Sequence, residues 1–204
     1  MKIPPKLSTG YRQFRGERYR TEADLYQAAA RGQSPATMII ACADSRVDPA
    51  TIFAAAPGEL FVVRNVAALV PPYETAGSYH GTSAALEFAV TVLQVSNVVV
   101  LGHGMCGGIA ASLQAAVDRP VGRFIGPWME QIATVRDELL ERIQPAHAEL
   151  RQQALERMAI QHSLDNLITF PFVAESVEKG SLVLHGAWFS IAEGELHCAA
   201  RQSG

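Results

Sequence analysis

The sequence predicts a single α/β domain with a mostly parallel central sheet flanked by helices, an N-terminal helical arm and an antiparallel C-terminal hairpin. Three short apolar runs, 37–41, 61–64 and 97–101, have the character of buried parallel strands and alternate with segments of helical spacing. A chain of 204 residues that is 49% hydrophobic and 18% charged can bury the core of one such domain. We therefore expect one domain over residues 1–204, with an arm at 1–35 and a core at 36–204.

A helix is expected in the arm, over residues 21–31. Thr21 is the predicted N-cap, because its side chain can accept a hydrogen bond from a free backbone N–H of the first turn. Gly32 directly follows the segment and is typical of a helix end. The arm is therefore expected to precede the core as an outlying helical segment.

The first core strand is expected over residues 37–41, an apolar run suited to burial in a parallel sheet. Asp48 and Pro49 then predict the N-cap and the first residue of a helix. Residues 42–47 thus connect the carboxyl end of a strand to a helix.

Two more strands are expected at 61–64 and 97–101, and between them residues 82–94 repeat apolar side chains at helical spacing. The third strand runs into the glycine-rich segment 102–108. Its glycines allow the backbone to turn sharply and to come close to a ligand. A further helix is expected from there to about residue 116.

The C-terminal part is expected to add helices and one hairpin. These elements are a helix that opens at Pro127, a helix over 146–169, a helical turn or two over 173–179, and strands over 182–190 and 195–200. The two strands flank Glu193-Gly194, which predicts an antiparallel hairpin.

Cys42, His103 and Cys106 supply two thiolates and one imidazole, a set that binds zinc. Cys42 follows the first predicted strand, and the other two follow the third, so all three are expected where open α/β sheets place their sites, at the carboxyl ends of the strands. A structural zinc site usually has four protein ligands, whereas a catalytic site has three and leaves the fourth position to water. The pattern therefore predicts a catalytic zinc site.

Asp44 and Arg46 follow Cys42 closely, and we expect them to form an ion pair beside the metal. A bidentate contact with Arg46 would hold the Asp44 carboxylate ionised and away from the zinc. Asp44 would then accept the hydrogen bond of a zinc-bound water and give the resulting hydroxide a defined direction of attack on an electrophilic carbon. The alternative is a surface ion pair of little consequence.

The composition argues against several other classes of protein. A formal net charge of −3, from 17 basic and 20 acidic residues without a basic cluster, argues against a nucleic-acid partner. No apolar run approaches the roughly 20 residues of a membrane span, and no secretory signal is visible, so a cytoplasmic protein is expected. The three cysteines argue against a disulfide framework, and Cys198 is interpreted as a small residue of the terminal strand.

Four segments resemble the beta class of carbonic anhydrases: CADSRV at 42–47, PGELFVVRN at 57–65, GTSAALE at 81–87 and GHGMCGG at 102–108. The resemblance extends from about Gln33 to Ile109. It implies reversible hydration of carbon dioxide to bicarbonate, with one Zn2+ per subunit on the three ligands named above and the aspartate–arginine pair as the orienting group. It also implies a homodimer or a dimer of dimers, in which subunits exchange N-terminal helices and the active-site cleft lies near the interface.

The resemblance further implies which residues line the pocket for carbon dioxide and bicarbonate: Gln33, Phe61, Phe88 and Gly107. Phe88 stands where plant-like members carry a tyrosine, and it keeps the ring without the hydroxyl. Ile39 stands where a second subgroup carries a tryptophan of a regulatory bicarbonate site. We therefore expect the open arrangement, with Asp44 on Arg46 and not on zinc.

Two rival functions stay open at this point. A hydrolase of carbonyl sulfide or carbon disulfide would use the same zinc-bound hydroxide on another linear electrophile. A non-catalytic zinc protein would have Asp44 as a permanent fourth ligand and a closed site.

Overall fold

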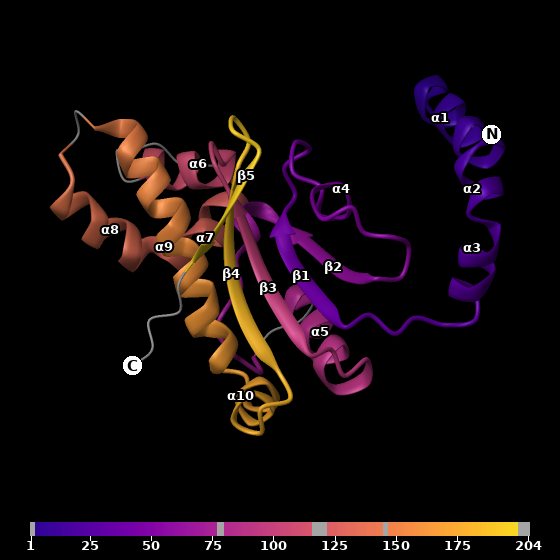
Figure 1. Cartoon of the computed structure of the whole chain (residues 1–204). Helices are drawn as coiled ribbons and strands as arrows, with labels where there is room; N and C mark the ends of the chain where they lie inside the picture. The colour runs from indigo at the N-terminus through magenta and orange to yellow at the C-terminus, as the bar shows by residue number, and fades with distance from the viewer. Residues whose placement is uncertain (1–2, 77–79, 116–121, 145–146, 200–204) are drawn as a thin grey trace.

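The centre of the molecule is a five-stranded sheet with the strand order β2-β1-β3-β4-β5. The computed structural model describes residues 3–76, 80–115, 122–144 and 147–199. The strands are β1 (Thr37–Cys42), β2 (Leu60–Asn65), β3 (Asn97–His103), β4 (Val183–Ser190) and β5 (Glu195–Ala199). Strands β1 to β4 are parallel to their neighbours, and β5 runs antiparallel to β4 (Figure 1). The predicted α/β fold with an antiparallel C-terminal hairpin is confirmed.

The helices of the core pack mainly on one face of the sheet. They are α4 (Pro49–Ile52), α5 (Gly81–Glu87), α6 (Gly107–Ala115), α7 (Ile125–Met129), α8 (Ala133–Arg142), α9 (Ala148–Ile168) and α10 (Pro171–Glu178). The largest apolar core lies between the sheet and α5, α9 and α10, and it contains Met38 and Ile40 of β1. Ile39 and Ala41 point to the other face and belong to a smaller cluster. Burial on both faces explains why the strand is a continuous apolar run.

The helix expected over 21–31 is present over a shorter span, but Thr21 as its N-cap was wrong, and the helices before it were not predicted. The arm consists of α1 (Pro5–Gly16), α2 (Arg18–Thr21) and α3 (Ala23–Ala29), so helical structure begins 16 residues before Thr21. Pro5 occupies the first turn, where the fixed φ angle of proline suits a helix and its missing N–H costs nothing. The Thr21 hydroxyl donates to the carbonyl of Arg18 at 3.0 Å and caps no helix start. None of the residues of these three helices is buried, and the arm stands away from the core beyond β2 (Figure 1).

The helix predicted over 82–94 is shorter than expected. After α5 the backbone changes to a π-helical turn, η2 (Phe88–Val92), and Gln94 has a positive φ of 54°. The β-branched residues in this stretch favour the departure from α-helix, because they lose side-chain freedom there. Among the helices that the structure describes, none is long and apolar enough to cross a membrane.

The hairpin turn between β4 and β5 confirms the role expected of Gly194. This residue has a φ of 71°, a backbone conformation that is energetically unfavourable for residues other than glycine. Asp48 is likewise the N-cap of α4, since its carboxylate accepts the Thr51 N–H at 3.0 Å and Pro49 follows in the first turn. The segment after Cys42 is therefore a strand-to-helix connection, as expected.

Candidate metal centre

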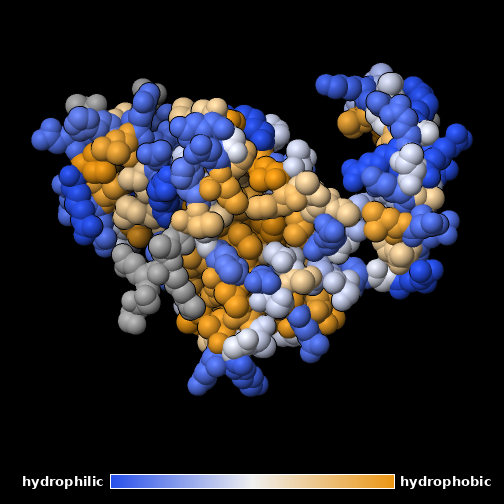
Figure 2. Space-filling model, viewed as in Figure 1, coloured by the Kyte–Doolittle hydropathy of each residue, from blue (hydrophilic) through white to orange (hydrophobic). Residues whose placement is uncertain are grey.

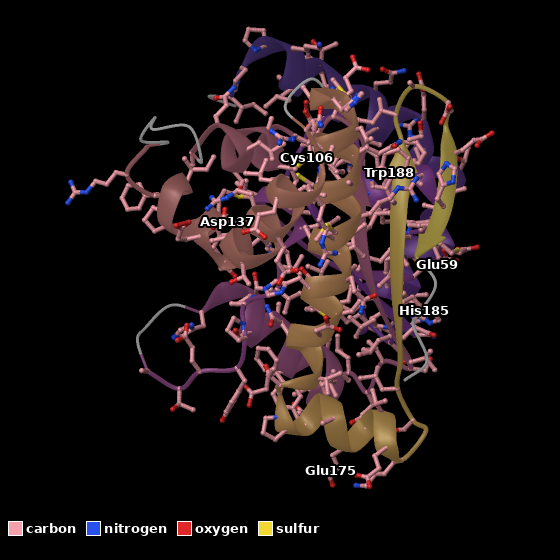
Figure 3. The ribbon with its side chains drawn as sticks, turned by 90° about the vertical axis from the view of Figure 1, so that its left-hand side faces the viewer. Glu59, Cys106, Asp137, Glu175, His185 and Trp188 are labelled. Carbon is pink, nitrogen blue, oxygen red and sulfur yellow. The ribbon has the colours of Figure 1, made fainter. Side chains whose placement is uncertain are left out.

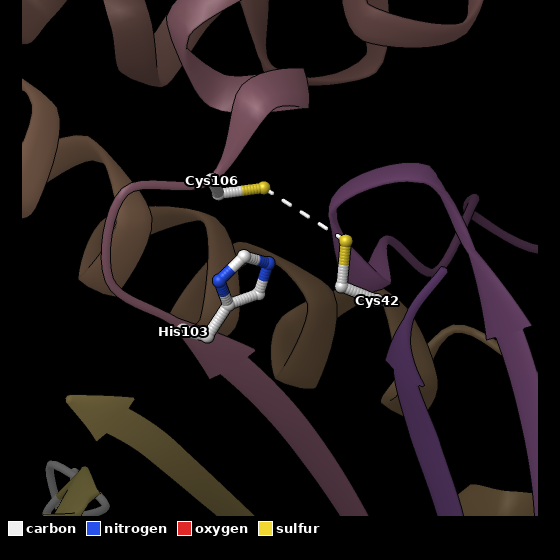
Figure 4. Close-up of side chains that lie close together, drawn as sticks. All are labelled: Cys42, His103 and Cys106. Carbon is white, nitrogen blue, oxygen red and sulfur yellow. Dashed lines mark hydrogen bonds between the residues drawn. The ribbon is translucent and has the colours of Figure 1, made fainter. Parts of the chain in front are cut away.

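The sheet brings Cys42, His103 and Cys106 together. Cys42 ends β1 and His103 ends β3, and these strands are parallel neighbours paired in register at Ala41 and Leu101. Cys106 lies in the turn that leads from β3 to α6. Their ligand atoms lie within 4.8 Å of one another, and all three side chains are buried (Figure 4).

The arrangement fits a zinc ion. The two Sγ atoms are 3.9 Å apart, close to the separation of about 3.8 Å that a tetrahedral zinc with bonds of about 2.3 Å requires. The Nδ1 atom of His103 lies 2.9 Å from the carbonyl oxygen of Gly104, so that Nδ1 carries the proton and Nε2 keeps its lone pair. Nε2 is buried and has no hydrogen-bond partner among the described residues. Two sulfurs and a free imidazole nitrogen are the donor set that zinc prefers.

The contact between the two thiols shifts their pKa values in opposite directions. The hydrogen bond with Cys106 lowers the pKa of the Cys42 thiol, and the same contact, together with burial, raises the pKa of Cys106. Backbone N–H groups of Asp44 and Ala67 favour the thiolate of Cys42, and those of Gly108 and Ile109 favour the thiolate of Cys106. A metal ion that binds both sulfurs must displace the proton of the Cys106 thiol.

Asp44 is held beside the ligands by Arg46. The guanidinium donates through Nη2 to Oδ2 at 2.7 Å and through Nε to Oδ1 at 2.9 Å, and the backbone N–H of Arg46 also donates to Oδ1 at 2.9 Å. These hydrogen bonds hold the pKa of Asp44 well below its usual range. Oδ2 lies 3.9 Å from Nε2 of His103. An ionised carboxylate with a fixed direction thus borders the three ligand atoms.

Arg64 braces the ligand loop, a role that sequence reasoning missed. From the edge strand β2 it donates to the carbonyl oxygens of Cys42 at 2.8 Å, Asp44 at 2.6 Å and Val47 at 2.9 Å. The only signal in the sequence is that a charged residue ends the apolar run 61–64; because Arg64 is exposed, its partners become visible only in the structure.

The backbone around the second loop is tightly turned. Met105 has a positive φ of 56°, and Ala67 and Ala68 in the neighbouring segment have positive values of 66° and 56°. A Cβ on Gly108 would lie 2.7 Å from Cγ1 of Val66. At Gly108 the glycine-rich segment therefore comes close to Val66 of the same chain, whereas a close approach to a ligand was expected.

The residues predicted to line the substrate pocket are divided in space. Gly107 begins α6 next to Cys106. Phe61 and Phe88 contact each other, with ring centroids 5.8 Å apart. Phe61 pairs with Met38 in the sheet, four residues along the strands from the pair of Cys42 and Asn65 at the metal site. Gln33 is exposed and precedes β1, so it lies at the opposite end of that strand from Cys42. Within one chain the structure brings only Gly107 to the metal ligands.

Comparisons with known proteins point to one family. A family model described as carbonic anhydrase matches residues 37–196. Two proteins of Arabidopsis thaliana are similar in sequence. Beta carbonic anhydrase 5, chloroplastic, is 37% identical over 88% of this chain and 59% of its own length; beta carbonic anhydrase 3 is 35% identical over 93% and 74%. The chain thus spans less than two thirds of the first of these relatives.

Solved structures give the same answer for the fold. The beta-carbonic anhydrase CcaA has a TM-score of 0.89 at 30% identity, and the match covers 96% of this chain and 94% of that one. One of two tetrameric beta-carbonic anhydrases from Sordaria macrospora has a TM-score of 0.85 at 27% identity, with 98% of both chains covered.

Proposed function

This chain belongs to the beta-carbonic anhydrase family, and we propose on that premise that it catalyses the reversible hydration of carbon dioxide to bicarbonate and a proton, with one zinc ion per subunit. The observation that carries the proposal is the buried group of Cys42, His103 and Cys106 with an ionised Asp44 at its border. Zinc held by this group would supply a Lewis acid that activates water for attack on a carbonyl-like carbon.

The residues of the chain have separate tasks in this reaction. Asp44 accepts the O–H of the attacking water, which leaves a lone pair directed at the carbon of carbon dioxide. Arg46 keeps the carboxylate ionised and turned toward the site through two hydrogen bonds. Arg64 fixes the backbone that carries both Cys42 and Asp44. The reaction thus depends on positioning more than on proton transfer by a side chain.

The contacts of Asp44 support the open arrangement of the site. Both of its carboxylate oxygens are engaged by Arg46, so the carboxylate has a partner other than a metal ion. Ile39 is buried in the small cluster on one face of the sheet, and it offers no polar group for a regulatory anion. A closed site with Asp44 as a fourth ligand would require both hydrogen bonds with the guanidinium to break.

A homodimer, or a dimer of dimers, is part of the proposal. The arm carries exposed apolar residues such as Leu7 and Tyr11, and the edge strand β2 exposes Val62. Apolar surface therefore lies on both sides of the gap between arm and core (Figure 2). A second copy placed in this gap would cover both surfaces, and the Sordaria relatives are described as tetrameric. Exchange of arms would bring Gln33 of one subunit to the other subunit.

One experiment tests the proposed function against its nearest rival. Stopped-flow hydration of carbon dioxide, followed with a pH indicator, is measured beside sulfide release from carbonyl sulfide and carbon disulfide on the same zinc-loaded preparation. The proposal predicts rapid hydration and sulfide release that is slower by orders of magnitude. Rapid sulfide release without hydration would assign the zinc site to the rival hydrolase.

A further inference from the structure

Glu156 is a buried carboxylate that the proposed reaction does not use. It lies on α9 and is 3% exposed. Burial of such a group is unfavourable unless hydrogen bonds replace its water. The hydrogen-bond partners of Glu156 therefore indicate its role.

The Glu156 carboxylate connects a metal ligand to a tryptophan. Oε1 accepts the backbone N–H of Cys106 at 3.0 Å and the side-chain amide of Gln152 at 3.2 Å. Oε2 accepts the indole N–H of Trp188, on β4, at 3.0 Å. Among the described residues no lysine or arginine forms a salt bridge with it. Its donors are thus three N–H groups, and the one from Cys106 belongs to the ligand loop.

Trp188 also contacts the loop between His103 and Cys106. A Cβ on Gly104 would lie 3.0 Å from Cζ2 of the indole, so the ring packs directly against the backbone between His103 and Cys106. The guanidinium of Arg157 lies 4.4 Å from the ring centroid. Cys106 and Trp188 both lie beside the upper part of α9 in Figure 3, and both donate to the Glu156 carboxylate of that helix. The ring is therefore fixed by a cation on its face and by a carboxylate at its N–H.

The loop itself needs such support. Met105 holds a left-handed backbone conformation, which is unfavourable for a side chain of that kind. The carbonyl of Met105 accepts from Arg46 at 3.0 Å, and the N–H of Gly104 donates to Phe189 at 2.9 Å. The backbone N–H of the ligand residue itself, Cys106, donates to Glu156 at 3.0 Å.

We propose that Glu156 is a positioning residue that locks the Cys106 ligand to Trp188. The inference rests on the metal site of the proposed function and extends it to α9. Glu156 is not one of the three metal ligands and acts through the backbone of Cys106; its removal loosens the turn that positions the Cys106 thiolate. Partners of this kind change metal affinity by about 10- to 100-fold when they are removed.

The test measures zinc loss from the holoenzyme and not only its activity. Zinc transfer to a chromophoric chelator is timed for the wild type, Glu156→Ala, Glu156→Gln and Trp188→Phe. The matched control is Glu149→Gln, an exposed carboxylate in the first turn of the same helix. We expect Glu156→Ala to release zinc about 10-fold faster or more. Glu156→Gln should lie between it and the wild type, because its amide oxygen still accepts one N–H, and the control should match the wild type.

A second readout separates positioning from simple stabilisation of the fold. The sequence has two tryptophans, so Trp128→Phe leaves Trp188 as the only indole. In that background, removal of zinc should change the fluorescence of Trp188, and Glu156→Gln should reduce this response. Variants that unfold at lower denaturant concentration but release zinc at the wild-type rate would overturn the inference. A wild type that retains no zinc would overturn the metal site as well, so the two failures are distinguishable.

Discussion

The guanidinium of Arg46 donates two hydrogen bonds to the Asp44 carboxylate, from Nη2 to Oδ2 at 2.7 Å and from Nε to Oδ1 at 2.9 Å. The same guanidinium donates to the carbonyl of Met105 at 3.0 Å, so one side chain joins the loop after β1 to the loop after β3. These are the two loops that carry the metal ligands. Arg46 therefore orients Asp44 and also connects the two loops that carry the metal ligands.

Arg46→Lys should lower kcat/KM for hydration of carbon dioxide by about 10- to 100-fold while the fold is kept. Lysine preserves the positive charge but offers no planar fork for two parallel hydrogen bonds. Stopped-flow rates and circular dichroism check this prediction. Arg18→Lys is the matched control, because Arg18 pairs with Glu22 on the arm and the change there should leave the rate unaltered.

The contribution of Asp48, the N-cap of α4, to the free energy of unfolding should depend on pH. The hydrogen bond from the Thr51 hydroxyl lowers the folded-state pKa of Asp48, and the backbone N–H of Thr51 adds to the effect. A carboxyl with a lowered folded pKa stabilises the protein above its unfolded pKa of about 4, and this contribution is lost as the pH falls through the folded pKa.

Asp48→Ala should therefore reduce the free energy of unfolding by about 1 kcal/mol at pH 7. The difference from the wild type should shrink below about pH 4. Urea unfolding at a series of pH values measures this difference, with both proteins either zinc-loaded or metal-free. A difference that grows on acidification would contradict the assignment of Asp48 as an ionised cap.

Gly108→Ala should destabilise the protein by about 1 to 3 kcal/mol. The new methyl group would lie 2.7 Å from Cγ1 of Val66 and 3.1 Å from Cβ of Ala67, and the neighbouring backbone is already in an unfavourable conformation. Gly107→Ala is the control, since a Cβ there meets nothing within 4 Å. Chemical denaturation should separate the two variants clearly; equal stability would mean that the segment moves aside easily.

Replacing Leu7, Tyr11 and Leu25 together by serine should weaken the proposed dimer. These side chains are exposed in the single chain and lie on the arm helices, and the proposed exchange of arms would bury them against another copy. Sedimentation velocity at micromolar concentration should show a shift to smaller species, with the substitution Lys6→Ser as a control. An unchanged mass would argue that the arm does not form the interface.

Sequence reasoning located the site because its ligands follow strands. Cys42 and His103 each end a short apolar run, and parallel strands place their carboxyl ends side by side. The cap at Asp48 and the turn at Gly194 also depend on one or two residues of known conformational preference, so they were predicted and found.

Other features depend on contacts between segments far apart in the chain. Glu156 stands beside Leu155 on a mostly apolar helix face, and nothing in its neighbours indicates that a loop 50 residues earlier supplies its donor. The early start of the arm helices escaped notice because Pro5 needs no capping side chain. The separation of Gln33, Phe61 and Phe88 from the ligands becomes visible only with the register of the sheet.

The most direct test of the metal-dependent reaction is the rate of carbon dioxide hydration as a function of bound zinc. The metal-free protein is titrated with zinc, and rate and zinc content are measured on the same samples. The account predicts a rate that rises in proportion to zinc and levels off at one ion per chain, with Cys106→Ser failing to recover activity. Hydration that is independent of zinc content, or a fully zinc-loaded chain that does not hydrate carbon dioxide, would contradict it.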